Sequence, residues 1–225
     1  MKSFNYCIYK RIAIIMVIIL NISLQVESQT SGSSTQFLFP EFNMSRIKLK
    51  DGKYQSMGLN YNTISEKLVF EKNGKLFDFV NINIIDTVYI QNRIFVPEGE
   101  VFFEVLVNKP ISLFVQHKSD LVFAGTSGGY GSESQVAGQT SWASFQTSNG
   151  KNNLTIPEDY NVKETPVYWI YKEGELLSFR NERQFLKIFS EEEADLKKYI
   201  KQNRIQFDDT SNLVMLVNRC NENYK

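Results

Sequence analysis

The chain has 225 residues, of which 42% are apolar and 22% are charged. This composition is typical of globular proteins, and the chain is long enough to bury a sizeable core, which excludes a wholly disordered protein. Basic and acidic residues are equally frequent, with 25 of each, so the chain offers no broad positive field for nucleic acid or anionic lipid.

Residues 1–28 have the composition of a secretory signal peptide. Lys2, Lys10 and Arg11 precede a short apolar run at 12–20, whereas a membrane-spanning helix needs roughly 20 apolar residues. We expect cleavage before Gln29, which leaves a mature chain with no transmembrane span and a slight acidic excess. The sequence therefore predicts export to the periplasm or the extracellular space. Residues 29–35 are polar and are interpreted as a flexible tether.

Residues 36–123 predict an antiparallel β-domain. Short stretches of alternating apolar and polar residues recur at regular spacing, separated by turn signals such as Asp51-Gly52 and Asn73-Gly74, which are typical of type I′ hairpins. About seven or eight strands of this kind favour a curved antiparallel meander, either a sandwich or a partly open barrel. The expected strands are 46–50, the hairpin 67–80, 86–90, 93–97, 100–108 and 111–118.

Two of these strands differ in their burial pattern. The stretch VFFEVLV at 101–107 has apolar residues on both faces, so we expect one face to meet the core and the other to meet the C-terminal helices or a partner. The stretch RIKLK at 46–50 has one polar face, which predicts a place at an edge or on an open side of the sheet.

Residues 124–155 are rich in Gly, Ser and Gln, which predicts a loop longer than most loops in compact domains. It contains the aromatic residues Tyr130, Trp142 and Phe145. These side chains have two interpretations: they form a contact surface for a sugar or a protein partner, or the loop folds back and buries them against the sheet.

Residues 156–225 predict a β-hairpin followed by two or three short helices. The hairpin is expected at 167–179 with its turn at Glu173-Gly174. Asn181 with Gln184 predicts the start of a first helix and Ser190 with Glu193 the start of a second. For a third helix, the candidate N-caps are Asp209, Thr210 and Ser211.

His117, Asp120 and Ser127 raise the question of a hydrolase triad, because Ser127 lies in a G-x-S-x-G pattern. A nucleophile elbow needs a histidine later in the chain, and none follows His117. In the chymotrypsin order the three residues come from distant segments, whereas here all three lie between residues 117 and 127. We therefore interpret the stretch as a strand that runs out into a loop. His117 remains a candidate partner contact, or else a solvated polar residue.

No cofactor or metal site is predicted. The glycines at 125, 128, 129 and 131 lack the Lys-Ser/Thr ending of a phosphate-binding loop. Because Cys7 lies in the signal peptide, the mature chain keeps only Cys220, which excludes an internal disulfide and a multi-cysteine metal site. Cys220 is expected to be a buried apolar residue near the end of the last helix, or to form an intermolecular disulfide.

Three short motifs are weak indicators of function. Glu158 and Asp159 follow Pro157 and are interpreted as a solvated turn, not as an acid/base pair. Asn43 and Asn153 begin N-x-S/T sequons, which could accept glycans in a suitable host.

Several segments together resemble a group of exported proteins from Gram-negative bacteria of the Bacteroidetes type, to which no activity is assigned. The resemblance rests on FLFPEF, LKDG followed by LNYN and LVF, FVPEGE, FFEVLVN, LFVQHKSDLV, GGYGS, PVYWI, ERQFLKIF, YIKQNRIQF and LVNRCN. It spans nearly all of the mature chain. It implies export, and it carries over no cofactor or catalytic residue.

The sequence thus predicts an exported, cofactor-free α+β protein with a curved antiparallel sheet, a long loop, and a C-terminal hairpin with helices. Its expected role is non-catalytic binding to a protein or glycan in the cell envelope, with no nucleic-acid partner. The alternative is a hydrolase whose catalytic carboxylates are scattered along the sequence. Two inward carboxylates roughly 5 to 10 Å apart would favour that alternative.

Overall fold

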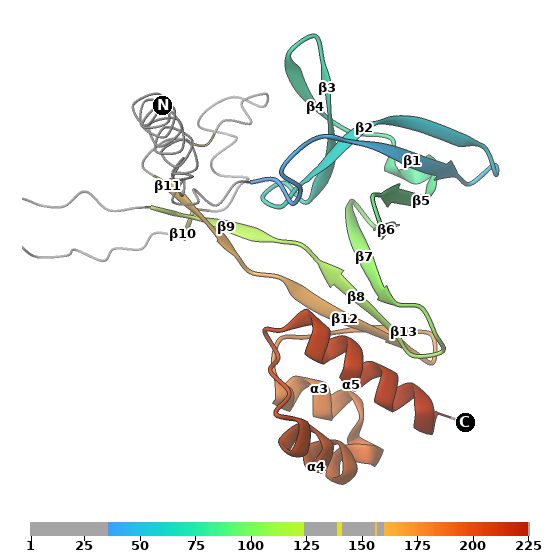
Figure 1. Cartoon of the computed structure of the whole chain (residues 1–225), viewed down its shortest axis with the longest axis vertical. Coiled ribbons are helices and arrows are strands. Elements are labelled where there is room, and N and C mark those ends of the chain that lie inside the picture. The colour runs from blue at the N-terminus through green and yellow to red at the C-terminus, as the bar shows by residue number, and fades with distance from the viewer. Residues whose placement is uncertain (1–35, 124–138, 141–155, 157–159, 225) are drawn as a thin grey trace, which may run out of the picture. The chain divides into compact units, whose positions relative to one another are not determined.

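The structure of the protein is a computed structural model that describes residues 36–123, 139–140, 156 and 160–224 (Figure 1). These residues form an open ten-stranded antiparallel sheet, a small three-stranded sheet and three C-terminal α-helices. The α+β class and the antiparallel meander predicted from the sequence are confirmed, and the large sheet does not close into a barrel.

The strands of the large sheet follow one another in space nearly as they do along the chain. From one edge to the other they are β13 (Glu175–Phe179), β12 (Val167–Lys172), β8 (Ser112–Gln116), β7 (Val101–Val107), β6 (Arg93–Glu98), β5 (Ile85–Ile90), β1 (Asn43–Leu49), β2 (Tyr54–Asn62), β3 (Lys67–Lys72) and β4 (Lys75–Asp78). Two neighbours are not consecutive: β1 pairs with β5, and β8 pairs with β12. The hairpin β12–β13 therefore extends the same sheet.

The small sheet continues two strands of the large one. β9 (Ser119–Phe123) follows β8 after a short break, and β11 (Tyr160–Glu164) leads into β12. β9 lies between β10 (Gln139–Thr140) and β11. Phe123 at the end of β9 pairs directly with Tyr160 at the start of β11, and their rings are in edge contact with centroids 5.6 Å apart. The chain thus leaves β9 and enters β11 at adjacent backbone positions, and β10 lies within the segment predicted to be a loop.

The predicted two-residue turns form as expected in two places. Asn73 and Gly74 have φ of 54° and 70°, and Glu173 and Gly174 have φ of 54° and 85°, which is the type I′ geometry. The Asp51-Gly52 turn is different, because only Gly52 has a positive φ and its N–H bonds to the carbonyl of Leu49. That hairpin has a longer loop, so the type I′ prediction is wrong there.

Strand β2 was not among the strands expected from the sequence. The C-terminal half of β2 contains two buried asparagines, Asn60 and Asn62. Asparagine by itself favours turns, so the local sequence has no strand signal here. The amide of Asn60 donates to the carbonyl of Phe39 and its oxygen accepts from the N–H of the same residue. The FLFPEF segment therefore satisfies a side chain that would otherwise be costly to bury.

Strand β1 is in the middle of the sheet, with β2 and β5 on its two sides. Arg46 is exposed while Ile47 is fully buried. The polar face of RIKLK therefore lies on an open side of the sheet and not at an edge.

Two buried clusters cover one face of the large sheet, which we call the core face. Cluster 1 joins β7, β8, β12 and β13 to the helices and contains Val107, Ile111, Leu113, Val115, Tyr168, Ile170, Phe179, Phe185, Leu186, Phe189, Leu196, Ile200, Ile205, Leu213, Leu216, Val217 and Cys220. Cluster 2 lies under β1, β2, β3, β5, β6 and β7 and contains Phe39, Ile47, Leu49, Leu59, Tyr61, Leu68, Ile82, Ile85, Val88, Ile90, Phe95 and Phe102.

The helices are α3 (Glu182–Ile188), α4 (Glu193–Asn203) and α5 (Thr210–Asn223), with short 3₁₀ turns at Ile82–Ile84 and Ser190–Glu192. Asn181 caps α3 by accepting from the N–H of Gln184, and Asp209 caps α5, as predicted. The capping box predicted at Ser190 and Glu193 is wrong, since Ser190 begins a 3₁₀ turn and the N-cap of α4 is Glu192. None of the described helices is long and apolar enough to cross a membrane.

The predicted two-faced strand is confirmed in β7. Phe102 and Glu104 point to the core face, and Phe103 and Val105 point to the other. Cross-strand pairing continues this second surface over β5, β6, β8 and β12. We call it the aromatic face; its residues are Tyr89, Ile94, Val96, Phe103, Val105, Phe114, Trp169 and Tyr171.

Glycine is expected to matter at the β12–β13 turn. Gly174→Ala should lower the free energy of unfolding by about 1 kcal/mol, because a Cβ disfavours the left-handed backbone that this turn requires. Gly58→Ala is the matched control, since Gly58 lies in a regular strand and a Cβ there meets nothing within 4 Å. Urea unfolding measures both. Equal losses for the two variants would contradict the turn assignment.

Candidate functional site

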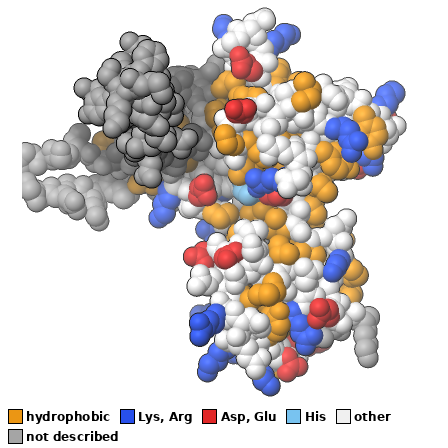
Figure 2. All heavy atoms as spheres, viewed as in Figure 1, with side chains coloured by type: hydrophobic (Ala, Val, Ile, Leu, Met, Phe, Trp, Pro, Cys, Tyr) orange, Lys and Arg blue, Asp and Glu red, His pale blue; other side chains and the backbone are white. Residues whose placement is uncertain are grey.

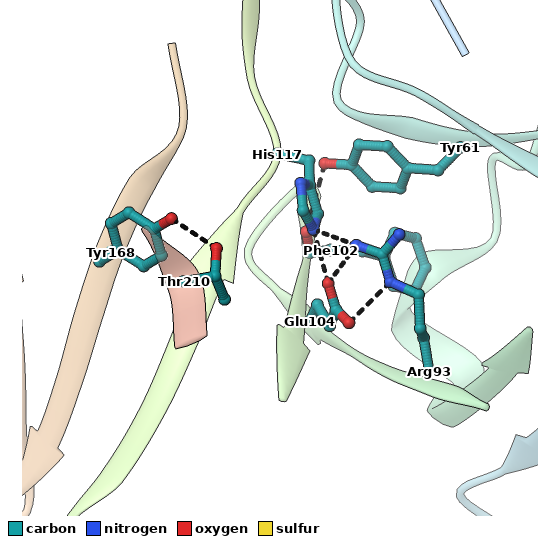
Figure 3. Close-up of polar contacts among 7 residues, drawn as sticks. All are labelled: Tyr61, Arg93, Phe102, Glu104, His117, Tyr168 and Thr210. Carbon is teal, nitrogen blue, oxygen red and sulfur yellow. Dashed lines mark hydrogen bonds and ion pairs between the residues drawn. The ribbon is translucent and has the colours of Figure 1, made fainter. Parts of the chain in front are cut away.

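Three neighbouring strands bring one buried polar cluster together on the core face. Arg93 begins β6, Glu104 lies in the middle of β7, and His117 directly follows β8. The register pairs Phe95 with Glu104 and Glu104 with Val115, so these side chains share one face. We call Arg93, Glu104 and His117 the Glu104 cluster (Figure 3).

Glu104 accepts hydrogen bonds on both carboxylate oxygens. Nε of Arg93 donates to Oε1 at 2.7 Å, and Nη2 of Arg93 bonds to Oε2. Nε2 of His117 lies 2.6 Å from Oε2. The Arg93 guanidinium therefore binds the carboxylate in the bidentate manner that gives the strongest ion pairs, with the imidazole as a further partner.

The contact between Nη2 of Arg93 and Nε2 of His117, at 2.8 Å, is a consequence of this arrangement. Both nitrogens point at the same Oε2, as Figure 3 shows. An unprotonated Nε2 would place its lone pair against the carboxylate oxygen. We therefore assign the proton to Nε2, with His117 donating to Glu104.

Aromatic rings surround the cluster and exclude water from one side of it. The ring of Tyr61 meets that of His117 edge-on at 6.0 Å between centroids, and Phe95 lies 6.4 Å away. The guanidinium of Arg93 lies 5.2 Å from the centroid of Phe39. On the other side the cluster is accessible: the only histidine of the chain is visible at the surface in Figure 2, and its side chain is 17% exposed.

Burial works to raise the pKa of Glu104, but hydrogen bonds from His117 and Arg93 outweigh it. The pKa of this carboxyl therefore lies below its ordinary value, and Glu104 is ionised at neutral pH. Burial and the nearby charge of Glu66 raise the pKa of Tyr61, so its phenol stays protonated. That phenol donates to the carbonyl of Phe102 at 3.3 Å.

A second polar group continues from β8 toward the small sheet. Nζ of Lys118 lies 3.1 Å from Oε1 of Glu66, and the amide of Gln116 donates to the other oxygen of the same carboxylate. The indole N–H of Trp169 donates to Gln116 at 3.1 Å. This group joins the loop after β2 to β8 and β12.

The chemistry available to the Glu104 cluster is limited. A carboxylate that holds Nε2–H of a histidine leaves Nδ1 free to accept a proton, as in a catalytic pair. Within the described ranges, however, no hydroxyl or thiol is hydrogen-bonded to His117. The same residues contain no group of three or more metal-binding side chains. The arrangement therefore fits a structural role, namely holding β6, β7 and β8 in register.

The structure describes only some of the candidate site residues that the sequence suggested. His117 belongs to the Glu104 cluster, whereas Asp120 accepts a hydrogen bond from Thr165 at 3.2 Å. The candidate contacts Tyr130, Trp142 and Phe145 lie outside the described residues, as do Ser127, Asn153, Pro157, Glu158 and Asp159.

Sequence reasoning missed Arg93 and Glu104. The signal for Glu104 was a single acidic residue within the apolar stretch VFFEVLV, a position where a charge needs a partner. Nothing in the sequence pointed to Arg93 as that partner.

Cys220 and Asn43 are both engaged in the fold. Cys220 is 1% exposed in cluster 1, and burial raises the pKa of its thiol to about 12, so it is the buried apolar residue that the sequence favoured. The side chain of Asn43 donates to the carbonyl of Glu41 and accepts from Gln91. Ser45, the third residue of that sequon, is 1% exposed, which disfavours glycosylation of the folded chain.

Comparison with known proteins finds no matching family model, no similar curated protein and no similar solved structure.

Glu104→Gln should lower the free energy of unfolding by about 2 kcal/mol, because it removes a buried charged acceptor and keeps the shape. Asp86→Asn is the matched control, since it breaks the exposed ion pair with Lys48 and should change stability far less. Chemical denaturation of the three proteins at pH 7 measures this. A loss no larger for Glu104→Gln than for Asp86→Asn would contradict the structural role.

The same variant should reveal a pH dependence. The folded pKa of Glu104 lies below the ordinary 4.5, so its stabilising charge is fully present above the unfolded pKa and is lost as the pH falls through the folded pKa. The stability difference between wild type and Glu104→Gln should therefore shrink as the pH falls below about 4.5. Urea titrations across this range would detect the change; a difference that grows in acid would refute it.

Proposed function

We propose that this protein is exported to the cell envelope or secreted, and that it acts there as a non-catalytic binding protein. The signal-like segment at 1–28 supports the location. The observation that carries the binding role is the aromatic face of the large sheet, which is apolar although it lies opposite the core.

The aromatic face has a buried centre, where Phe103 is 4% exposed, and exposed apolar side chains around it. None of its residues belongs to the buried clusters, and the apolar residues of the described helices pack on the opposite face. Phe103 stacks on Trp169 at 5.2 Å and lies 6.5 Å from Phe114. Ile94 is 39% exposed and Tyr171 is 44% exposed. Antiparallel sheets usually keep such a face polar, so an apolar one marks a contact surface.

The composition of this face indicates a protein or glycan partner. Aromatic side chains are enriched at interfaces, and their rings supply flat apolar area with little conformational entropy to lose. The predicted loop contacts Tyr130, Trp142 and Phe145 remain a second element of the same proposal.

The state of the Glu104 cluster supports a non-catalytic role over the hydrolase alternative. A general acid or base needs an oxygen that can exchange a proton with a substrate. Both oxygens of Glu104 are instead hydrogen-bonded within the protein, and its pKa is lowered. Within the described residues, the hydrolase alternative therefore has no specific observation in its favour.

In-cell cross-linking of the tagged protein, after fractionation of the envelope, tests the role. A partner should be captured by wild type and lost with Ile94→Asp or Tyr171→Asp, because each puts a charge on the aromatic face. Met215→Asp is the matched control, since Met215 is 40% exposed on α5. A triple alanine variant of Tyr130, Trp142 and Phe145 tests the loop separately.

Capture that is unchanged in the Ile94 and Tyr171 variants would overturn the role of the aromatic face. If no partner is captured from either the periplasmic or the secreted fraction, the binding proposal itself fails.

A further inference from the structure

The β3–β4 hairpin carries a second exposed surface, separate from the aromatic face. The register pairs Phe70 with Phe77 and Lys72 with Lys75, so these four side chains lie on one face of the hairpin. This is the continuation of the core face beyond cluster 2, since Leu68, two residues before Phe70, is buried there. Figure 2 shows basic side chains at the tip of the hairpin, at the top of the view.

The two lysines lie directly opposite each other without an acidic partner among the described residues. Lys67 pairs with Asp78, and Glu71 points to the other face opposite Leu76. Like charges opposite one another destabilise a strand pair. An anionic group beside these two lysines would reduce that repulsion.

The aromatic pair beside the lysines is flat and open. The rings of Phe70 and Phe77 stack with centroids 5.6 Å apart and planes 23° apart, and Phe77 is 43% exposed. Together with Lys72, Asn73 and Lys75 they line a shallow surface hollow. The hollow therefore combines an apolar floor with a positive rim.

β4 is also the terminal strand of the large sheet, as far as the described part of the chain shows. In a two-residue hairpin, the residues that flank the turn exchange hydrogen bonds, and the pattern alternates from there. The N–H of Phe79 bonds to the carbonyl of Leu68, in agreement with this alternation. The backbone groups of Leu76 and Asp78 consequently point away from β3, toward the free edge. Such an edge is a template for another strand.

We propose that an extended segment of a partner protein adds to the free edge of β4 and places an acidic side chain beside Lys72 and Lys75. In an added strand, the residues opposite Lys75 and Phe77 are two positions apart and lie on the same face. The partner segment therefore has an apolar or aromatic residue two positions from an aspartate or glutamate. This surface is independent of the proposed aromatic face, so either can fail without the other.

The test uses a fluorescein-labelled peptide, Thr-Val-Phe-Thr-Glu-Val-Thr, and fluorescence anisotropy with the purified protein. Wild type should bind the peptide, and Lys72→Glu/Lys75→Glu should bind it about tenfold more weakly. Lys198→Glu on α4 is the control, since Lys198 is likewise exposed. A peptide with Lys in place of Glu should show the reverse preference, binding the double variant better than wild type. This charge swap excludes misfolding as the cause.

A third peptide, with proline between the Phe and the Glu, distinguishes strand addition from simple attraction. It keeps both side chains but disrupts backbone pairing with β4, so it should not bind. Equal binding of the proline peptide, or no binding of the original up to about 1 mM, would overturn the proposal. The free edge of β4 could instead bind a second copy of this chain, and light scattering of the protein alone tests this. A dimer that is lost in the double variant would also overturn the proposal.

Discussion

Glu104 is a charged side chain in the middle of an otherwise apolar strand, and the fold depends on how the neighbouring strands satisfy it. Arg93 reaches it from β6 and His117 reaches it from the end of β8. A carboxylate left unpaired there would cost several kcal/mol, so a slipped register of β6 or β8 is disfavoured. The Glu104 cluster lies on the core face between cluster 2 and cluster 1. The Glu104 cluster is thus a group of polar residues between two apolar cores, and aromatic rings limit its access to water.

The two faces of the large sheet have different chemistry, and this difference is what supports a binding role. The core face is covered by the helices at one end, and at the other Tyr61 of β2 lies against Phe95 of β6 and bonds to the carbonyl of Phe102 in β7. The aromatic face takes no part in these clusters, yet Phe103, Phe114 and Trp169 pack closely against one another there. Mutual packing keeps the apolar side chains ordered, so that little conformational entropy is lost when a partner covers them.

Local sequence signals predicted the local structure well. Alternation and the Asn-Gly and Glu-Gly turns placed most strands, and Asn181 and Asp209 marked two helix starts. The sequence-based prediction failed where contacts between residues distant in sequence determine the structure. Asn60 and Asn62 hide the strand pattern of β2. The amide of Asn60 is satisfied by the backbone of Phe39, 21 residues away, whereas the side-chain oxygen of Asn62 accepts from the N–H groups of Ile64 and Ser65. The pairing of β8 with β12 joins segments separated by the long loop. The Glu104 cluster likewise needs the strand order, which alternation alone does not specify.

The direct pairing of Phe123 with Tyr160 has a consequence for how the chain can vary. The two ends of the intervening segment are held about 5 Å apart by the small sheet, whatever the number of residues between them. Because the entropy of closing a loop grows only slowly with its length, residues can be added or removed on either side of β10, which pairs with β9, with little effect on either core. The fold thus provides a place where the length of the chain can vary outside β10, while the Glu104 cluster and clusters 1 and 2 stay unchanged.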